Sequence, residues 1–405
     1  MDVQNLRIGD ICKMVCSGGT PKSSEPSYYD GGIPWLNTNE VNFCNIYSTN
    51  KTISEEGLKK SAAKFIPVNT VIVAMYGVTA GKSAIAKIPL TTNQACCNLI
   101  IDDKKADYNY VYNFLRLQSD FLNKLANGGA QQNLNSIIIK KFKISLPSLP
   151  TQRKIASILS AYDSLIENNT KRIRLLEQMA ENLYKEWFVR FRFPGHEKVE
   201  MENGLPKGWR RERISQFYNT CSGGTPSRAK EEYFENGNIP WVKTGEIQDS
   251  IIIDTEEHIT EDAIKHSSAK MLPAKSIVMA MYGVNIGKLA YLNKEMSCNQ
   301  ACCVFMDKRD FSSRHYLFHY LFSIREYLLM IGFGAAQQNL SQEMIKNIRI
   351  IMPEDIVLKA FERKVDIMYD EVLNLTKQTQ SLTRQRDLLL PRLMSGKLNV
   401  SQNNN

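Results

Sequence analysis

The chain has 405 residues, of which 43% are hydrophobic and 23% charged, with 22 Gly and 14 Pro. This composition excludes a largely disordered chain, a collagen-like repeat and a small disulfide scaffold, and the length predicts two or three domains. No apolar run approaches the ~20 residues of a membrane span, and the first residues lack signal-peptide order. We therefore expect a cytoplasmic protein with no membrane contact.

The net charge of +9 favours polyanionic partners weakly, because it is spread over the whole length. The nine cysteines are expected to be free thiols. Pairs at 96–97 and 302–303 lie in apolar stretches without metal-binding spacing, and His315 and His319 lack an evident third ligand. We predict no metal site.

The dominant feature is an internal duplication. Five segments of the first half recur in the same order 205 or 206 residues later: 16–21 and 221–226, 33–35 and 239–241, 74–78 and 280–284, 93–97 and 299–303, and 131–134 and 337–340. A domain-sized period with two copies indicates a duplicated unit and not a solenoid.

Each copy has the same order of predicted elements. About 145 residues of mixed pattern come first, with short apolar strands at 71–75 and 277–281. A proline-bearing joint and one long helix follow. The expected divisions are mixed α/β domains at 1–148 and 209–354, long helices at 149–193 and 355–398, a linker at 194–208 and a disordered tail at 399–405.

Both long helices carry an apolar seam. Across 155–187, and again across 361–393, core-compatible residues recur at alternating steps of four and three, which is typical of a coiled coil. Asn169, Thr379 and Arg386 interrupt the seam and would fix its register. We expect an α+β protein with two duplicated mixed α/β domains, an antiparallel intramolecular coiled coil and pseudo-twofold symmetry. The alternative is two amphipathic helices, each packed on its own domain.

Four further segments carry recognisable sequence motifs. Residues 151–156 have the pattern of a helix start, 187–195 of its end, 203–209 of the entry to a second domain, and 389–398 of a C-terminal signature. Together with the repeat, they resemble the specificity subunit of Type I restriction–modification enzymes. One departure is at residues 3–10, which lack the Leu-Pro-x-Gly-Trp entry.

The resemblance implies a non-catalytic subunit that binds double-stranded DNA with a split recognition site. The domains at 1–148 and 209–354 would be target-recognition domains, each reading one half-site. The chain would dock methyltransferase subunits, expected to be two, and through them restriction and translocase subunits. A 33-residue helix over 155–187 spans about 50 Å, and half-sites one turn of B-DNA apart are separated by roughly 34–36 Å. The hypothesis is that the helices set the gap between half-sites.

Loops rich in Gly, Thr, Asn and Gln are candidates for DNA contact, because backbone N–H groups bind phosphates and amide side chains can read base edges. The Gly-Gly-Thr-Pro segments supply Gly18, Gly19, Thr20, Lys22, Gly223, Gly224, Thr225 and Arg228. The amide-rich segments supply Gln131, Gln132, Asn133, Gln337, Gln338 and Asn339. The alternatives are a plain turn for the first group and caps on the following helix for the second.

Residues 76–83 resemble a nucleotide-binding P-loop. Three residues separate Gly77 from Gly81 where that loop has four, and Lys288 is followed by Leu289 instead of Ser or Thr. We therefore expect a DNA-contacting loop and no nucleotide hydrolysis. Its candidate residues are Tyr76, Thr79, Lys82, Tyr282, Asn285 and Lys288.

The two copies differ at 36–40 and 242–246 in side chains that could contact bases. The candidates are Asn37, Thr38 and Asn39 in the first copy and Lys243 and Thr244 in the second. Because Asn favours adenine and Lys favours guanine, we expect related but non-identical half-sites.

The polar faces of the helices are the predicted docking surface for partner subunits, with a solvated charged face as the alternative. The candidates are Lys171, Arg172, Arg174, Glu177, Glu181, Trp187, Lys377, Gln378 and Arg384.

The chain lacks an adenine-methylation motif, a Gly-rich S-adenosylmethionine loop and a complete Walker A motif. We therefore expect no catalytic residue and no cofactor. Two other functions remain open: a stand-alone P-loop-like NTPase or nuclease, and a duplicated scaffold that binds protein or glycan.

Overall fold

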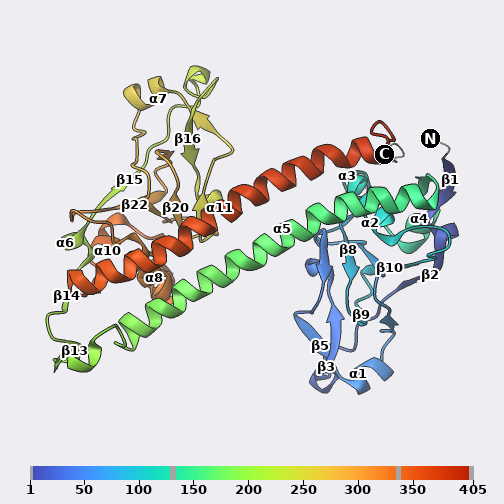
Figure 1. The fold of residues 1–405 in the computed structure, drawn as a ribbon, viewed down its shortest axis with the longest axis horizontal. Coiled ribbons are helices and arrows are strands. Elements are labelled where there is room, and N and C mark those ends of the chain that lie inside the picture. The colour runs from blue at the N-terminus through green and yellow to red at the C-terminus, as the bar shows by residue number, and fades with distance from the viewer. Residues whose placement is uncertain (1–2, 128–133, 334–338, 401–405) are drawn as a thin grey trace, which may run out of the picture. The chain divides into compact units, whose positions relative to one another are not determined.

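The computed structural model describes residues 3–127, 134–333 and 339–400 of the chain (Figure 1). The chain forms two compact units. Unit 1 comprises residues 1–167 and 380–405, and unit 2 comprises residues 168–379. Each unit therefore contains one α/β domain and part of each of the two long helices.

The core of unit 1 is a five-stranded sheet with the order β2-β10-β7-β8-β4. Its pairs are antiparallel except for β4, which runs parallel to β8. Every residue of β7 is buried, so the apolar strand predicted at 71–75 is confirmed, one residue shorter. The strands are β2 (Cys12–Ser17), β4 (Cys44–Ile46), β7 (Val71–Ala74), β8 (Ser83–Ala86) and β10 (Cys96–Ile101).

A second sheet of unit 1, with the order β5-β3-β9-β6, carries Trp35, and β1 pairs with β11. These strands are β1 (Gln4–Arg7), β3 (Tyr29–Leu36), β5 (Lys51–Ile53), β6 (Phe65–Ile66), β9 (Leu90–Thr92) and β11 (Lys143–Leu146). The short helices are η1 (Ile8–Ile11), η2 (Pro26–Tyr28), η3 (Thr38–Glu40), α1 (Glu55–Lys59), α2 (Tyr108–Leu117), α3 (Ser119–Asn127) and α4 (Ser136–Lys141). Helix α2 begins where the Asp107 carboxylate accepts a hydrogen bond from the N–H of Tyr110 at 3.0 Å, as an N-cap does.

Unit 2 repeats this topology. Its central sheet has the order β15-β22-β19-β20-β17, again with its last strand parallel to the neighbouring one. The strands are β14 (Arg210–Arg213), β15 (Tyr218–Ser222), β16 (Ile239–Val242), β17 (Ser250–Ile252), β18 (His258–Ile259), β19 (Ile277–Ala280), β20 (Leu289–Leu292), β21 (Ser297–Cys298), β22 (Cys302–Asp307) and β23 (Arg349–Met352), preceded by the β12 (Met201–Glu202) and β13 (Leu205–Pro206) hairpin. The short helices are η5 (His196–Lys198), α6 (Ile214–Phe217), η6 (Glu231–Tyr233), η7 (Thr244–Glu246), α7 (Glu261–His266), α8 (Arg314–Ser323), α9 (Arg325–Phe333) and α10 (Gln342–Lys346).

The long helices are α5 (Leu149–Tyr184), which continues as the π-helical turn η4 (Lys185–Val189), and α11 (Asp355–Met394). Both begin where predicted and end four residues early. At 1.5 Å per residue, the 36 residues of α5 span about 54 Å. Within the described residues, no helix is both long and apolar enough to cross a membrane.

The two long helices pair antiparallel inside each unit. In unit 1, the start of α5 and the end of α11 share one apolar cluster, and Arg386 bonds Asp163 at 2.8 Å. In unit 2, Asn169 donates to Gln378 at 3.4 Å, and Arg172 pairs with Glu371 at 2.6 Å. As residue numbers rise along α5, those of its contacts on α11 fall, which confirms the predicted antiparallel pairing.

The aromatic residues after α5 form part of the core of unit 2. Trp187 is 5% exposed, and its ring centroid lies 5.9 Å from that of Phe361. Phe188 packs edge-on against Tyr316 and Phe361. The prediction that Trp187 docks a partner is therefore corrected, because the end of α5 folds onto its own unit and leaves this indole almost no surface.

Candidate nucleic-acid interface

The Gly-Gly-Thr-Pro segment of unit 1 follows β2 and is packed against β9. A Cβ atom on Gly18 would lie 2.0 Å from the carbonyl oxygen of Thr92, so this position requires glycine. The N–H of Gly19 donates to the same carbonyl at 2.8 Å. The expected phosphate contact through the Gly19 N–H is therefore corrected, because that group is already bonded inside the unit. Thr20 and Lys22 are exposed and remain available.

Unit 2 has the same arrangement. A Cβ atom on Gly223 would lie 2.0 Å from the carbonyl oxygen of Cys298, and the N–H of Gly224 donates to that oxygen at 2.9 Å. The Gly224 N–H is likewise not free for a phosphate. Thr225 and Arg228 are exposed.

Two buried tryptophans hold these segments in place. The indole Nε1 of Trp35 donates to the carbonyl oxygen of Gly19 at 2.9 Å, and that of Trp241 donates to Gly224 at 3.0 Å. Both tryptophans lie in the repeated Ile-Pro-Trp segments. A buried indole finds a hydrogen-bond partner, and here that partner is the turn that presents Thr20 or Thr225.

The repeated Asn-Gln segments complete the contact and were absent from the sequence-based candidates. The hydroxyl of Thr20 donates to the Gln94 side chain, and that of Thr225 donates to Gln300. In unit 1, the Tyr76 hydroxyl also donates to the carbonyl oxygen of Gln94 at 3.4 Å. The available signal was the exact recurrence of both glutamines in the duplication.

The loops that resemble a P-loop are closed by their own hydrogen bonds. The N–H of Gly81 donates to Ala74 at 2.9 Å, and that of Lys82 donates to Thr79 at 2.9 Å. Unit 2 has the same bonds, from Gly287 to Ala280 and from Lys288 to Asn285, both 2.9 Å. These N–H groups point into the loop, whereas a P-loop directs its N–H groups at a nucleotide.

Side chains then fasten each loop to the turn that follows β3 or β16. The Thr79 hydroxyl donates to the carbonyl oxygen of Thr38 at 2.5 Å, and the Asn285 amide donates to that of Thr244 at 2.9 Å. The lysine ammonium groups add bonds from Lys82 to Asn42 at 2.8 Å and from Lys288 to Gln248 at 2.6 Å. In each unit, three of the predicted segments thus form one connected group, which we call the loop cluster: the Gly-Gly-Thr-Pro turn, the loop that resembles a P-loop, and the turn at 36–40 or 242–246.

The loop cluster of unit 2 contains a group of charges around Lys243. Its ammonium pairs with Glu256 at 3.2 Å and Glu257 at 3.0 Å, and Arg228 pairs with Glu257 at 2.7 Å. Hydrogen bonds from Arg228 and Lys243 lower the pKa of Glu257. For Lys243 to contact a base, its ammonium must give up its ion pairs with Glu256 and Glu257 and bind the DNA instead.

At the corresponding positions of unit 1, neutral or basic residues replace this lysine and its two glutamates. Asn37 stands where Lys243 stands, and Asn50 and Lys51 replace the two glutamates. The Asn37 amide oxygen accepts a bond from Asn93 at 3.4 Å. Residue 39 is exposed, and the turn keeps its shape because Glu40 accepts from the N–H of Asn37 at 3.1 Å.

The amide-rich candidates cannot be placed in this cluster. Gln131, Gln132, Asn133, Gln337 and Gln338 lie outside the described residues. Asn339 is described and half-buried.

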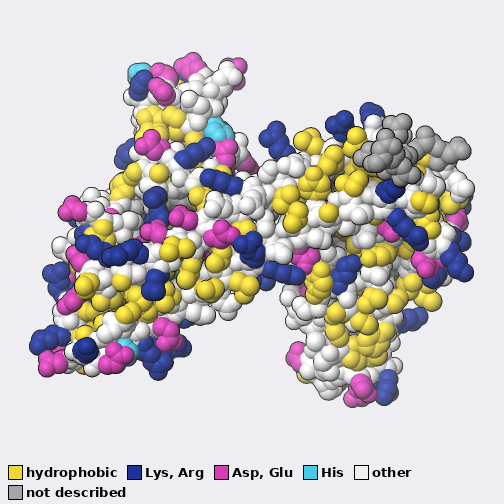
Figure 2. All heavy atoms as spheres, viewed as in Figure 1, with side chains coloured by type: hydrophobic (Ala, Val, Ile, Leu, Met, Phe, Trp, Pro, Cys, Tyr) yellow, Lys and Arg dark blue, Asp and Glu magenta, His cyan; other side chains and the backbone are white. Residues whose placement is uncertain are grey.

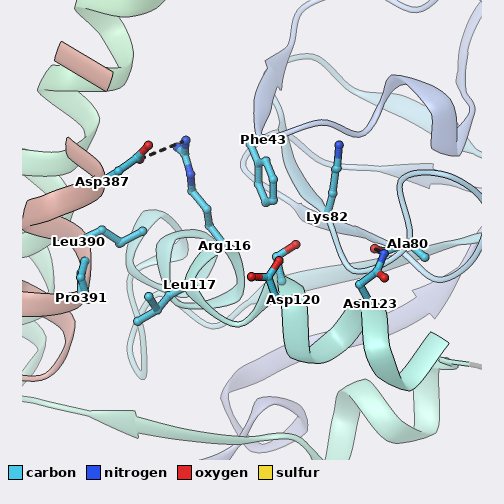
Figure 3. A pocket seen from close by; sticks show the side chains of 11 residues that line it. Phe43, Ala80, Lys82, Arg116, Leu117, Asp120, Asn123, Asp387, Leu390 and Pro391 are labelled. Atoms are coloured by element: carbon cyan, nitrogen blue, oxygen red, sulfur yellow. Dashed lines mark hydrogen bonds and ion pairs between the residues drawn. The ribbon is translucent and has the colours of Figure 1, made fainter. Parts of the chain in front are cut away.

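A hollow of about 420 Å³ opens beside the loop of unit 1 (Figure 3). Lys82 and Phe43 face it, and Arg116 bridges to Asp387 on α11 at 3.8 Å. The lining residues are Phe43, Ala80, Lys82, Arg116, Leu117, Ser119, Asp120, Asn123, Asp387, Leu390 and Pro391.

In unit 2, an ion pair occupies the equivalent positions. Arg325 stands where Ser119 stands, and Asp249 where Phe43 stands. The guanidinium pairs with the Asp249 carboxylate and donates to the carbonyl oxygen of Gly287 at 3.1 Å. This side chain therefore braces the loop that carries Lys288.

The predicted docking residues on the long helices have mixed surroundings. Glu177 and Glu181 are half-buried, and burial raises the pKa of Glu177 to about 7. The exposed candidates are Lys171, Arg172, Arg174, Lys377, Gln378 and Arg384. Figure 2 shows basic, acidic and apolar side chains interspersed on the viewed face of each unit.

Known proteins resemble this chain over almost its full length. The family model described as Type I restriction modification DNA specificity domain matches residues 1–178 and 206–374. The Type I restriction enzyme MjaIX specificity subunit of Methanocaldococcus jannaschii is 31% identical, covering 98% of this chain and 93% of that protein. The Type I restriction enzyme HindI specificity subunit of Haemophilus influenzae is 24% identical over 64% of this chain and 70% of its own. A Type I S subunit structure from M. genitalium shares the fold, with a TM-score of 0.65, 18% identity, and coverage of 97% of this chain and 96% of that one.

Proposed function

The chain belongs to the Type I restriction–modification DNA specificity family, and from this premise we propose that its two loop clusters each read one half of a split DNA target. Specificity subunits of this family bind DNA and assemble with the other subunits of the restriction–modification complex. The residues proposed to contact DNA are the exposed members of the two clusters, chiefly Thr20, Lys22, Thr225 and Arg228.

The observation that carries the proposal is the pairing of a repeated frame with unequal side chains. Both clusters are held by the same indole bond and the same loop hydrogen bonds. The polar side chains beside that frame differ, with Asn37 and Lys51 in unit 1 and Lys243 and Glu257 in unit 2. Two loop clusters with the same backbone structure but different polar side chains suit two half-sites of different sequence.

Methylome mapping tests the proposal directly. Cells that express this chain with its partner methyltransferase subunits should carry methyl groups in a split motif, and deleting this gene should remove them. Replacing residues 242–248 with those of unit 1 should alter one half of the motif and leave the other half unchanged. A motif that ignores both changes would contradict the proposal.

We also propose that the helices dock the partners and that this chain supplies no catalysis. Exposed Arg174 and Lys377 belong to this docking face, and the two copies of the helix suit two methyltransferase subunits. Native mass spectrometry of the purified complex gives the subunit ratio. The isolated chain should turn over neither ATP with Mg²⁺ and DNA nor S-adenosylmethionine; turnover would favour the NTPase or nuclease alternative.

The gap between half-sites is proposed to follow the number of residues in the long helices. Inserting one heptad into both α5 and α11 lengthens each helix by about 10 Å, at 1.5 Å per residue. The mapped motif should then keep both half-sites and widen its unspecified gap by about three base pairs, at 3.4 Å each. An unchanged gap would contradict this part of the proposal.

A further inference from the structure

One residue of each loop cluster is unusually exposed for its type. Val78 is 91% exposed and Val284 is 99% exposed, and they occupy the same position of the duplication. Single exposed apolar residues are common on proteins. Here, however, the same residue type is exposed at the same place in both units, at the end of the repeated segments 74–78 and 280–284.

Each valine lies in a turn whose next residue is hydrogen-bonded to another segment of its unit. Gly77 has a φ of 86° and Gly283 a φ of 78°, so the chain turns sharply immediately before each valine. The residues that follow fasten the loop, through Thr79 to Thr38 and through Asn285 to Thr244. The turn before each valine and the hydrogen bond after it therefore direct the side chain out of the loop.

Local structure does not explain the choice of valine. Turn positions favour Gly, Asn, Asp, Ser and Pro, and β-branched residues bring no benefit there. Packing does not explain it either, because at 91% and 99% exposure the side chains touch little of their own unit. An exposed apolar side chain gains stability when a ligand covers it and removes it from water.

DNA offers a matching apolar group. In the major groove, the C5-methyl group of thymine is the apolar feature of the base edges, and small apolar side chains contact it. Insertion between stacked bases is made by longer side chains such as Phe, Leu, Ile and Met, and valine has two methyl groups on Cβ and no further reach. Contact at the edge of a base fits its length better.

Resting on the proposed function, we propose that Val78 and Val284 each contact the C5-methyl group of a thymine in the half-site read by their own unit. The contact would make an A·T pair at one position of each half-site preferred. It complements the polar groups of the cluster, which read hydrogen-bonding edges.

The test uses the purified complex of the full chain with its methyltransferase subunits, and duplexes carrying the mapped target. Replacing the thymines of one half-site with uracil removes their methyl groups and no hydrogen-bonding group. Wild-type affinity should fall about fourfold for the contacted position, from ~0.8 kcal/mol per buried methyl-sized group. In Val78→Ala, uracil in the unit 1 half-site should have no further effect, while uracil in the other half-site should keep its full effect. Val284→Ala should show the reverse.

The matched control is Val68→Ala, which shortens another exposed valine of unit 1 and should leave the thymine preference intact. Val78→Thr, which keeps one methyl group, should retain part of the preference. Equal uracil effects in wild type and both alanine variants, or a half-site without an A·T pair, would overturn the inference while leaving target recognition standing. The absence of any split motif would instead overturn the proposed function.

Discussion

Unit 1 and unit 2 share a backbone frame but differ in the charge beside it. Trp35 and Trp241 make the same bond to the glycine turn, at 2.9 and 3.0 Å. Beside this frame, Lys51 of unit 1 is replaced by Glu257 of unit 2. The bonds that hold the frame join repeated residues and main-chain groups, so neighbouring side chains can reverse their charge without changing its shape.

The units differ again where a long helix packs against the start of a short helix that precedes it in the chain, α2 in unit 1 and α8 in unit 2. In unit 1, the buried Gln152 accepts from the N–H of Asp107 at 3.0 Å. In unit 2, the buried Glu362 accepts from the N–H of Tyr316 at 2.8 Å and that of His315 at 3.3 Å. This contact uses a neutral amide in unit 1 and an ionisable carboxyl in unit 2. The stability of unit 2 should therefore depend on the protonation of Glu362, whereas Gln152 does not titrate.

The shared frame should fail in the same way in both units. Gly18→Ala and Gly223→Ala each place a Cβ atom 2.0 Å from a carbonyl oxygen of the neighbouring segment. Each should destabilise its own unit by about 3 kcal/mol or more, because backbone on both sides must move. Urea unfolding of the full chain measures the loss. Gly245→Ala, which meets nothing within 4 Å, is the matched control; equal effects of all three would contradict the role of the frame.

Exchanging the side chains beside the frame should change specificity without changing stability. The triple variant Lys243→Asn, Glu256→Asn and Glu257→Lys gives unit 2 the polar groups of unit 1. Its original half-site should lose roughly 10- to 100-fold in affinity, since a base-reading contact contributes ~1–3 kcal/mol. Methylome mapping should show one altered half-site. Glu212→Lys, a charge change on β14, should alter neither, and a triple variant with an unchanged motif would separate these residues from base reading.

The fold was largely predictable because its signals are periodic or repeated. The seam of α5 and α11 recurs every seven residues, and the duplication is exact over several segments, so neither depends on distant contacts. The site was less predictable because its geometry depends on such contacts. Gly19 bonds Thr92, 73 positions away, and the sequence could not show that its N–H is occupied.

Residue type alone also gave a wrong prediction where the role of a side chain depends on whether it is buried. Trp187 suits an interface and a core equally well, and the core of unit 2 contains it. The charges around Lys243 required knowledge that Glu256 and Glu257 lie on the neighbouring strand connection. Exposure of Val78 and Val284 likewise has no sequence signature beyond their recurrence.

Lys82 and Lys288 should each contribute to DNA affinity by a similar amount, whatever the DNA sequence. Lys82→Ala combined with Lys288→Ala should reduce the slope of log affinity against log salt by about 2, at ~0.9 per phosphate contact. Binding to specific and nonspecific duplexes should weaken by similar factors. Titrations from 50 to 200 mM salt measure the slope. The control pair is Lys59→Ala with Lys265→Ala, on α1 and α7, which should leave the slope unchanged; a specific loss at one half-site would instead assign the lysines to base reading.

The smallest expected difference between the units is one of pH. Burial raises the pKa of Glu362 to about 8 and lowers the pKa of His315 to about 4. Folded unit 2 binds the Glu362 proton more tightly than the unfolded chain, so its stability should rise as pH falls from 8 to about 6.5. Below 6.5, the unfolded histidines gain protons more readily than the folded ones, while the raised pKa values of Glu362 and Glu177 still favour the folded unit, so the rise in stability should level off.

Glu362→Gln keeps one oxygen, which can accept the shorter bond from the Tyr316 N–H, and removes the titration. At pH 8, its unfolding transition should lie about 2–4 °C above that of the wild type, for a gain of about 1 kcal/mol. That gain should shrink towards pH 6.5, where the wild-type carboxyl is mostly protonated in the folded unit. Calorimetry of the full chain at both pH values measures the shift, with exposed Glu354→Gln as the control. A wild-type transition that does not move between pH 8 and 6.5 would mean that the Glu362 carboxyl keeps its ordinary pKa, and that unit 2 tolerates the charge through its two N–H bonds.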